Sequence, residues 1–146
     1  LHERVPIEDV ALLTSRDYVP SGCTALLDAV GGAIRYHERV QHILPPELRP
    51  EHTLFCITTD GLENASKEYS YARVKRMISA AQERGWEFMF LGANIDAAEE
   101  AGRLGIREDR AVQYEPAPDG VLFAFDTLCQ ASVAMRCGED LDFEEH

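Results

Sequence analysis

The side chains best suited to chemistry are oxygen donors that follow two short apolar runs of the chain. After the first run come Thr58, Thr59, Asp60, Gly61, Glu63 and Asn64, after the second come Asn94 and Asp96, and Thr24 stands at the start of a predicted helix. Hydroxyl and carboxylate oxygens suit a hard cation such as Mg²⁺, which keeps several waters. The same residues are also common turn and cap formers. Spacing alone therefore leaves a metal site and plain turn chemistry both open.

The elements that must position these residues alternate between helices and strands. The apolar runs 53–58 and 86–91 predict buried strands, and 111–114 predicts a weaker third strand. Apolar spacing predicts a helix from Thr24 to before Pro45, a second ending at Gly85 and a third over 97–104 closed by Gly105. A last helix is predicted after a turn at 116–120, and the following residues are expected to share its face: Leu122, Phe125, Cys129 and Val133. Residues 1–14 suit an edge strand or an irregular segment.

This alternation predicts one α/β domain over 1–146, with a doubly wound, mostly parallel sheet and helices on both faces. In such a sheet, ligands bind beyond the carboxyl ends of the strands, where loops and helix N-termini gather. Thr24 and Asp60 are therefore predicted to meet at one edge. The sequence contains no GxGxxG, P-loop or GxSxG motif, and no candidate catalytic base.

The charge balance excludes several classes of partner. The 146 residues carry 14 Lys and Arg against 26 Asp and Glu, a net charge of −12, and 138–146 forms an acidic tail. Nucleic acid and anionic membrane surfaces would be repelled, because both are bound through clustered basic side chains. No apolar run is long enough to span a bilayer, and the first residues do not form a signal peptide. We therefore expect a cytoplasmic protein.

Two segments resemble a von Willebrand factor A domain. The first is Gly22-Cys23-Thr24-Ala25-Leu26-Leu27-Asp28-Ala29-Val30, and the second is Ile57-Thr58-Thr59-Asp60-Gly61. The run 85–96 is similar to a cytoplasmic bacterial branch of the family. The resemblance implies a Rossmann-like fold with a metal-ion-dependent adhesion site, in which Thr24 and Asp60 bind Mg²⁺ and Asn94 and Asp96 shape the rim.

The family's first motif, D-x-S-x-S, is missing from these 146 residues. In the family it supplies most of the direct metal ligands from a central strand, so the chain is expected to represent the carboxyl-terminal two-thirds of such a domain. With only two protein ligands, we expect no tight Mg²⁺ binding unless the missing motif is supplied to the site. The missing strand would also leave the edge of 53–58 bare, which predicts a homo-oligomer or pairing with the chain's own amino-terminal segment.

The resemblance implies a non-enzymatic protein-binding module whose metal docks an acidic side chain of a partner protein. One alternative is a Mg²⁺-dependent hydrolase or phosphotransfer enzyme that uses Asp60, with Lys67 and Arg73 as charge clamps if the loop folds back. Another is a structural assembly subunit with a degenerate site.

Overall fold

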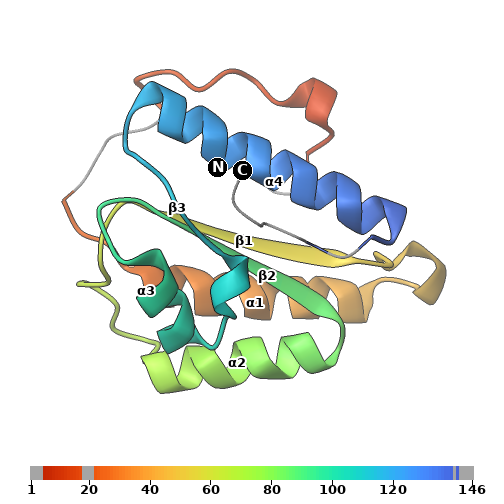
Figure 1. Ribbon diagram of the computed structural model, residues 1–146. Coiled ribbons are helices and arrows are strands. Elements are labelled where there is room, and N and C mark those ends of the chain that lie inside the picture. The colour runs from red at the N-terminus through yellow and green to blue at the C-terminus, as the bar shows by residue number, and fades with distance from the viewer. Residues whose placement is uncertain (1–4, 18–21, 140, 142–146) are drawn as a thin grey trace.

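Four α-helices and three β-strands alternate along the described part of the chain (Figure 1). The computed structural model describes residues 5–17, 22–139 and 141. The helices are α1 (Leu26–Ile43), α2 (Tyr71–Glu83), α3 (Ala97–Leu104) and α4 (Pro118–Cys137). The strands are β1 (Thr53–Thr59), β2 (Trp86–Gly92) and β3 (Ala111–Gln113). This order confirms the predicted α/β fold.

The three strands form one parallel sheet in the order β1-β2-β3. β1 pairs with β2 from Thr53 opposite Trp86 to Thr59 opposite Gly92, and β3 pairs with the last three residues of β2. All three strands therefore end at the same edge of the sheet. Within the described residues β1 has a partner on one side only, so it is an edge strand.

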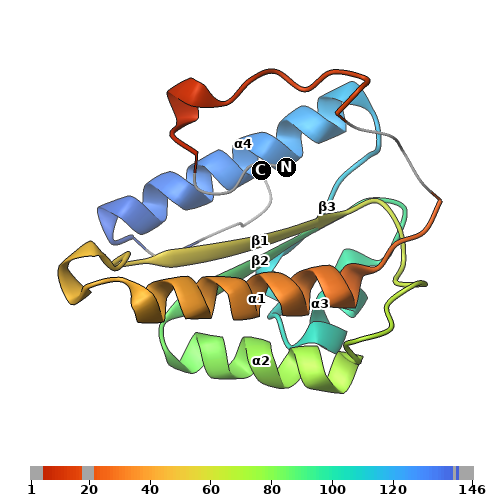
Figure 2. The same ribbon diagram turned by 180° about the vertical axis from the view of Figure 1, so that it is seen from behind.

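Helices cover both faces of the sheet, as Figures 1 and 2 show: α1, α2 and α3 lie on one face and α4 lies on the other. β2 lies between two cores because successive side chains of a strand point to opposite faces. Phe88 and Phe90 pack in the cluster with α1, α2 and α3, whereas Met89 and Leu91 pack in the cluster with α4. These four side chains are almost fully buried, which confirms the doubly wound arrangement.

Local capping explains why several helix boundaries match the prediction. Asp96 begins α3 by accepting a hydrogen bond from the Glu99 amide at 2.8 Å, and Gly105 ends it in the left-handed region at φ 81°. Ser70 caps α2 in the same way by accepting from the Arg73 amide. Cap residues act on their immediate neighbours, so the sequence alone predicts them well.

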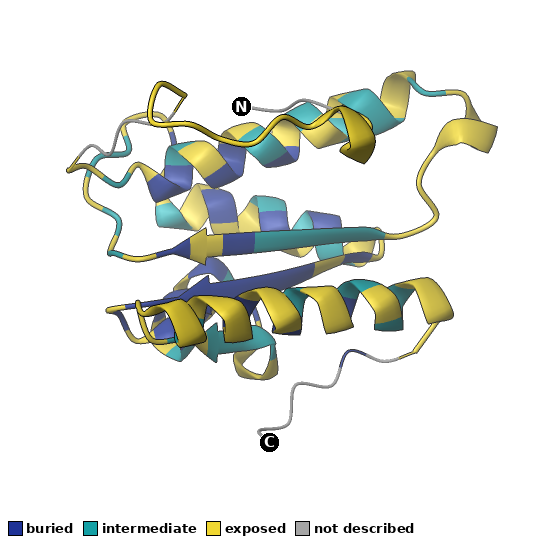
Figure 3. Cartoon of the chain, turned by 90° about the horizontal axis from the view of Figure 1, so that it is seen from above, coloured by how far each residue is buried: buried dark blue, intermediate teal, exposed yellow. Residues whose placement is uncertain are grey.

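The last helix begins earlier than predicted, and the residues expected to share a face are all exposed. α4 begins at Pro118, because proline is favourable in the first turn, where its missing N–H has no partner to lose. Leu122 and Phe125 are 63% and 59% exposed, whereas Ala124 and Ala131 are buried in the cluster that also holds Met89. Figure 3 shows exposed residues along much of this helix. Because the alanine side chains are small, this face of α4 can pack closely against Met89, and it is the face that is buried.

The first described residues form no strand. Residues 5–17 contain a single short 3₁₀ helix at Ile7–Asp9, and Leu12 is 92% exposed. The edge-strand interpretation is therefore wrong for 5–14, and residues 1–4 lie outside the described residues. Most of the predicted acidic tail at 138–146 also lies outside them, while Gly138 belongs to the cap of α4 with φ 70°.

β1 is less buried than predicted. Its first four residues are half-buried, whereas β2 is buried at six of its seven positions. The difference follows from the open side of β1, where no neighbouring strand of the described chain covers it. None of the helices that the structure describes is long and apolar enough to cross a membrane.

Candidate functional site

Thr24 lies at the carboxyl edge of the sheet, in contact with the loop that follows β1. Its amide donates to Oδ1 of Asn64 at 2.8 Å, and its carbonyl accepts from the Asn64 amide at 3.0 Å. This two-way pairing joins residues 40 positions apart in the sequence. It also explains why α1 begins at Leu26 rather than at the predicted Thr24, since the backbone of Thr24 is bonded to the loop.

The hydroxyl of Thr24 lies beside the Asp60-Gly61 turn. A Cβ built on Gly61 would be 3.7 Å from Oγ1 of Thr24, so the hydroxyl lies next to the residue that follows Asp60. Asn94, at the end of β2, reaches the same turn and donates from Nδ2 to the Asp60 carbonyl at 3.4 Å. The structure thus brings Thr24, Asp60 and Asn94 to one edge of the sheet, as parallel strands require.

Glu63 holds the start of α1 against the loop. One carboxylate oxygen accepts from the Leu27 amide and the Ser66 hydroxyl, both at 2.8 Å. The other accepts from the amides of Ala65 and Ser66 at 2.9 and 2.7 Å. Burial raises the pKa of Glu63, but the hydrogen bonds from Leu27, Ser66 and Ala65 outweigh it and hold the pKa below its usual value. An ionised Glu63 also suits the positive end of the helix.

Asp28 forms the second connection between α1 and the loop. Its carboxylate accepts from the backbone amides of Lys67, Glu68 and Tyr69 at 2.8 to 2.9 Å. The hydrogen bond from Lys67 contributes most to lowering the pKa of Asp28. Glu63 and Asp28 together bond the first turn of α1 to the loop after β1. The sequence contains both acids but does not predict their distant partners, which lie 36 residues from Glu63 and 39 to 41 residues from Asp28.

Tyr114 was not predicted as a site residue. It follows β3, and its amide donates to the Gly92 carbonyl at 2.9 Å. Burial raises the pKa of Tyr114, and the Asp60 carboxylate adds to the effect by disfavouring the phenolate. The sequence could have predicted that Tyr114 lies at the carboxyl edge of the sheet, because it directly follows the third strand and the three strands end at one edge.

Other predicted site residues form hydrogen bonds or ring contacts within the protein. The Thr59 hydroxyl donates to the Gly61 carbonyl at 2.9 Å and so stabilises the turn. Asp96 caps α3, as described above. The guanidinium of Arg73 lies 4.4 Å over the Tyr69 ring and donates to the Glu68 carbonyl at 3.2 Å. These contacts make Thr59 and Asp96 supports of the site rather than free ligands.

Among residues 5–17, 22–139 and 141, no three His, Cys, Asp or Glu side chains are grouped so that they could hold a metal ion. Thr24 and Asp60 contribute one hydroxyl and one carboxylate to this edge, and both are oxygen donors of the kind that Mg²⁺ accepts.

The chain was compared with protein-family models, with curated proteins and with solved structures, and none of the three comparisons gives a match.

Proposed function

We propose that the chain is a protein-binding module of the von Willebrand factor A type, in which Mg²⁺ at the carboxyl edge of the sheet docks an acidic side chain of a partner protein. One observation carries the proposal: the Thr24 hydroxyl lies beside the Asp60-Gly61 turn although 36 residues separate Thr24 from Asp60 in the sequence. The hydrogen bonds of Glu63 and Asp28 support it, because they hold the two segments together.

The chemistry of the donors agrees with this function. A carboxylate and a hydroxyl leave most positions of an octahedral Mg²⁺ to water, and a partner's carboxylate can replace one of these waters. With two protein ligands the ion remains mostly hydrated, so we expect only weak binding by this chain. A D-x-S-x-S motif, if another segment supplied one, would raise the affinity by adding further oxygen ligands.

The hydrolase alternative has less support at the same edge. Phosphoryl transfer requires cationic groups that contact the transferred phosphate. Of the two candidates, Arg73 is engaged with Tyr69 and Glu68, and Lys67 is an exposed residue whose amide is bonded to Asp28. The structural-subunit alternative requires that neither metal binding nor turnover be found.

Paramagnetic NMR tests the proposal directly. Mn²⁺, which accepts the same oxygen ligands as Mg²⁺, should broaden the amide signals of Thr24, Asp60 and Gly61 first, and excess Mg²⁺ should restore them. Thr24→Ala and Asp60→Asn should each abolish this local effect. Asp109→Asn is the matched control, because Asp109 precedes β3 at the opposite edge of the sheet and pairs with Arg107.

The outcomes separate the alternatives. In the presence of Mg²⁺, acetate should shift the same amides, since it is the smallest mimic of an acidic side chain. The metal-site proposal would be contradicted if the broadening were spread over the acidic surface, or if it persisted in Asp60→Asn. Hydrolysis of a generic phosphate ester that is lost in Asp60→Ala would favour the enzyme. Absence of both effects would favour the structural subunit.

A further inference from the structure

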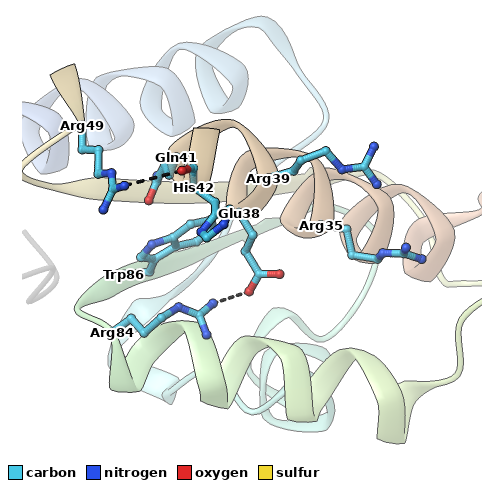
Figure 4. Close-up of a pocket in the computed structure, with 8 residues that line it drawn as sticks. All are labelled: Arg35, Glu38, Arg39, Gln41, His42, Arg49, Arg84 and Trp86. Atoms are coloured by element: carbon cyan, nitrogen blue, oxygen red, sulfur yellow. Dashed lines mark hydrogen bonds and ion pairs between the residues drawn. The ribbon is translucent and has the colours of Figure 1, made fainter. Parts of the chain in front are cut away.

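A groove rich in arginine lies at the amino ends of the strands, away from the edge that holds Thr24 and Asp60. It runs between the second half of α1 and the start of β2, and it is shallow and largely open to solvent. Figure 4 shows it with Trp86 at its base. The residues used below to define this arginine groove are Arg35, Glu38, Arg39, Arg49, Arg84 and Trp86.

The charge of the groove is opposite to that of the chain. Acidic residues outnumber Lys and Arg by 26 to 14 overall, yet the groove is lined by four arginines and one carboxylate, that of Glu38. Salt screens charges beyond about 8 Å at physiological ionic strength. A compact anion in the groove therefore experiences mainly these arginines, whereas a long polyanion such as nucleic acid also meets the acidic surface around them.

Contacts within the protein already position two of the arginines. Arg84 lies over the Trp86 ring, 5.9 Å from its centroid, and forms an ion pair with Glu38 from α1. Arg49 donates from Nε to the Leu44 carbonyl at 3.0 Å, just beyond the end of α1. A guanidinium has five N–H donors, so both retain donors for a ligand. Because these side chains are already ordered, binding requires less loss of rotamer freedom.

The remaining arginines add charge rather than direct contacts near Trp86. In Figure 4 Arg35 and Arg39 extend along α1 away from the tryptophan, while Arg84 and Glu38 point toward each other. Arg35 also donates to the Tyr69 hydroxyl at 3.3 Å. Arg49 and Arg84 are the two arginines that Figure 4 draws beside Trp86, one on each side of its ring.

We propose that the arginine groove binds a phosphate monoester. Glu38 already provides Arg84 with a carboxylate, so a second single carboxylate would gain little by replacing it. A phosphate monoester carries close to two negative charges and three acceptor oxygens, so it can accept two hydrogen bonds from the Arg84 guanidinium while the neighbouring arginines attract its charge. Glu38 then acts as an internal competitor that occupies Arg84 until the more highly charged ligand arrives.

Trp86 makes the test specific, because it is the single tryptophan of the chain and forms the base of the groove. Titration with glycerol phosphate at constant ionic strength should change its fluorescence saturably, and calorimetry should give the same affinity. We expect Arg84→Gln to weaken binding about tenfold, as for loss of a hydrogen bond to a charged group. Arg49→Gln should weaken binding by a smaller factor, because it removes a nearby positive charge. Glu38→Gln should strengthen binding several-fold, because the competitor is removed.

Arg107→Gln is the matched control, since Arg107 lies outside the groove and pairs with Asp109. Circular dichroism melts establish that each variant is folded, and calorimetry does not depend on the altered fluorescence baseline of Arg84→Gln. A short phosphoserine peptide is the second probe. If the groove binds this peptide more tightly than glycerol phosphate, its ligand is a phosphorylated protein; if the two affinities are equal, its ligand is a small phosphate monoester. A fluorescence change that sodium chloride reproduces, or affinity unchanged in Arg49→Gln and Arg84→Gln, would overturn the proposal.

Discussion

Replacing Glu63 by alanine should loosen the contact between α1 and the loop after β1. The carboxylate accepts four hydrogen bonds, from the amides of Leu27, Ala65 and Ser66 and from the Ser66 hydroxyl. In Glu63→Ala these donors lose their partner together. Leu27 is affected most, because it lies in the first turn of α1, where no helical carbonyl is available to its amide.

The size of the effect follows from the number of bonds and their exposure. A hydrogen bond to a charged group stabilises by about 1.5–3 kcal/mol, but such bonds are not additive when they share one acceptor. Glu63 is half-buried, so water can replace part of what is lost. We therefore expect a loss of about 2–4 kcal/mol in the free energy of unfolding, with the larger value if the Leu27 amide stays dry. For a domain of this size the melting temperature should fall by roughly 5–15 °C.

Urea denaturation followed by circular dichroism measures the loss, and hydrogen exchange locates it. The amides of Leu27, Ala65 and Ser66 should exchange faster in Glu63→Ala, while those of β2 change only with global stability. Glu83→Ala removes the same charge from an exposed position at the end of α2 and is expected to change stability by less than about 0.5 kcal/mol. If Glu63→Ala matched this control, the four hydrogen bonds would not hold the loop.

Three further predictions concern other parts of the molecule. The pKa values of Asp28 and Glu63 are lowered by folding, so their contribution to stability is complete above the usual carboxyl range and is lost as the pH falls through their folded values. The urea midpoint should therefore fall as the pH is lowered below the usual carboxyl range, and less steeply in Asp28→Asn. Gly31→Ala should destabilise by about 1–3 kcal/mol, because its Cβ would overlap the buried Tyr69 ring, with Cε1 at 2.6 Å. Its neighbour Gly32 faces open space, so Gly32→Ala should instead stabilise α1 by about 0.5–1 kcal/mol, and equal melting temperatures for the two variants would contradict this packing. The open edge of β1 should promote self-association that rises with concentration in light scattering, and a monomer at all concentrations with rapidly exchanging β1 amides would refute it.

The sequence by itself determined the order of the elements and most of their boundaries. Strand-forming runs and helical spacing depend on residues within a few positions of one another, as do caps such as Asp96 and Gly105. These local terms placed α3 at 97–104 and predicted a parallel sheet whose strands end at one edge. The meeting of Thr24 with the Asp60-Gly61 turn follows from the same topology.

Tertiary packing decided what no local pattern could. α4 is apolar on more than one face, and the sheet selected the face with Ala124 and Ala131 because small side chains permit close approach. Glu63 joins segments about 36 residues apart, and the arginine groove draws on α1, the connector before β1 and the start of β2. Such contacts form only when distant segments meet, so their energies depend on the folded arrangement as a whole.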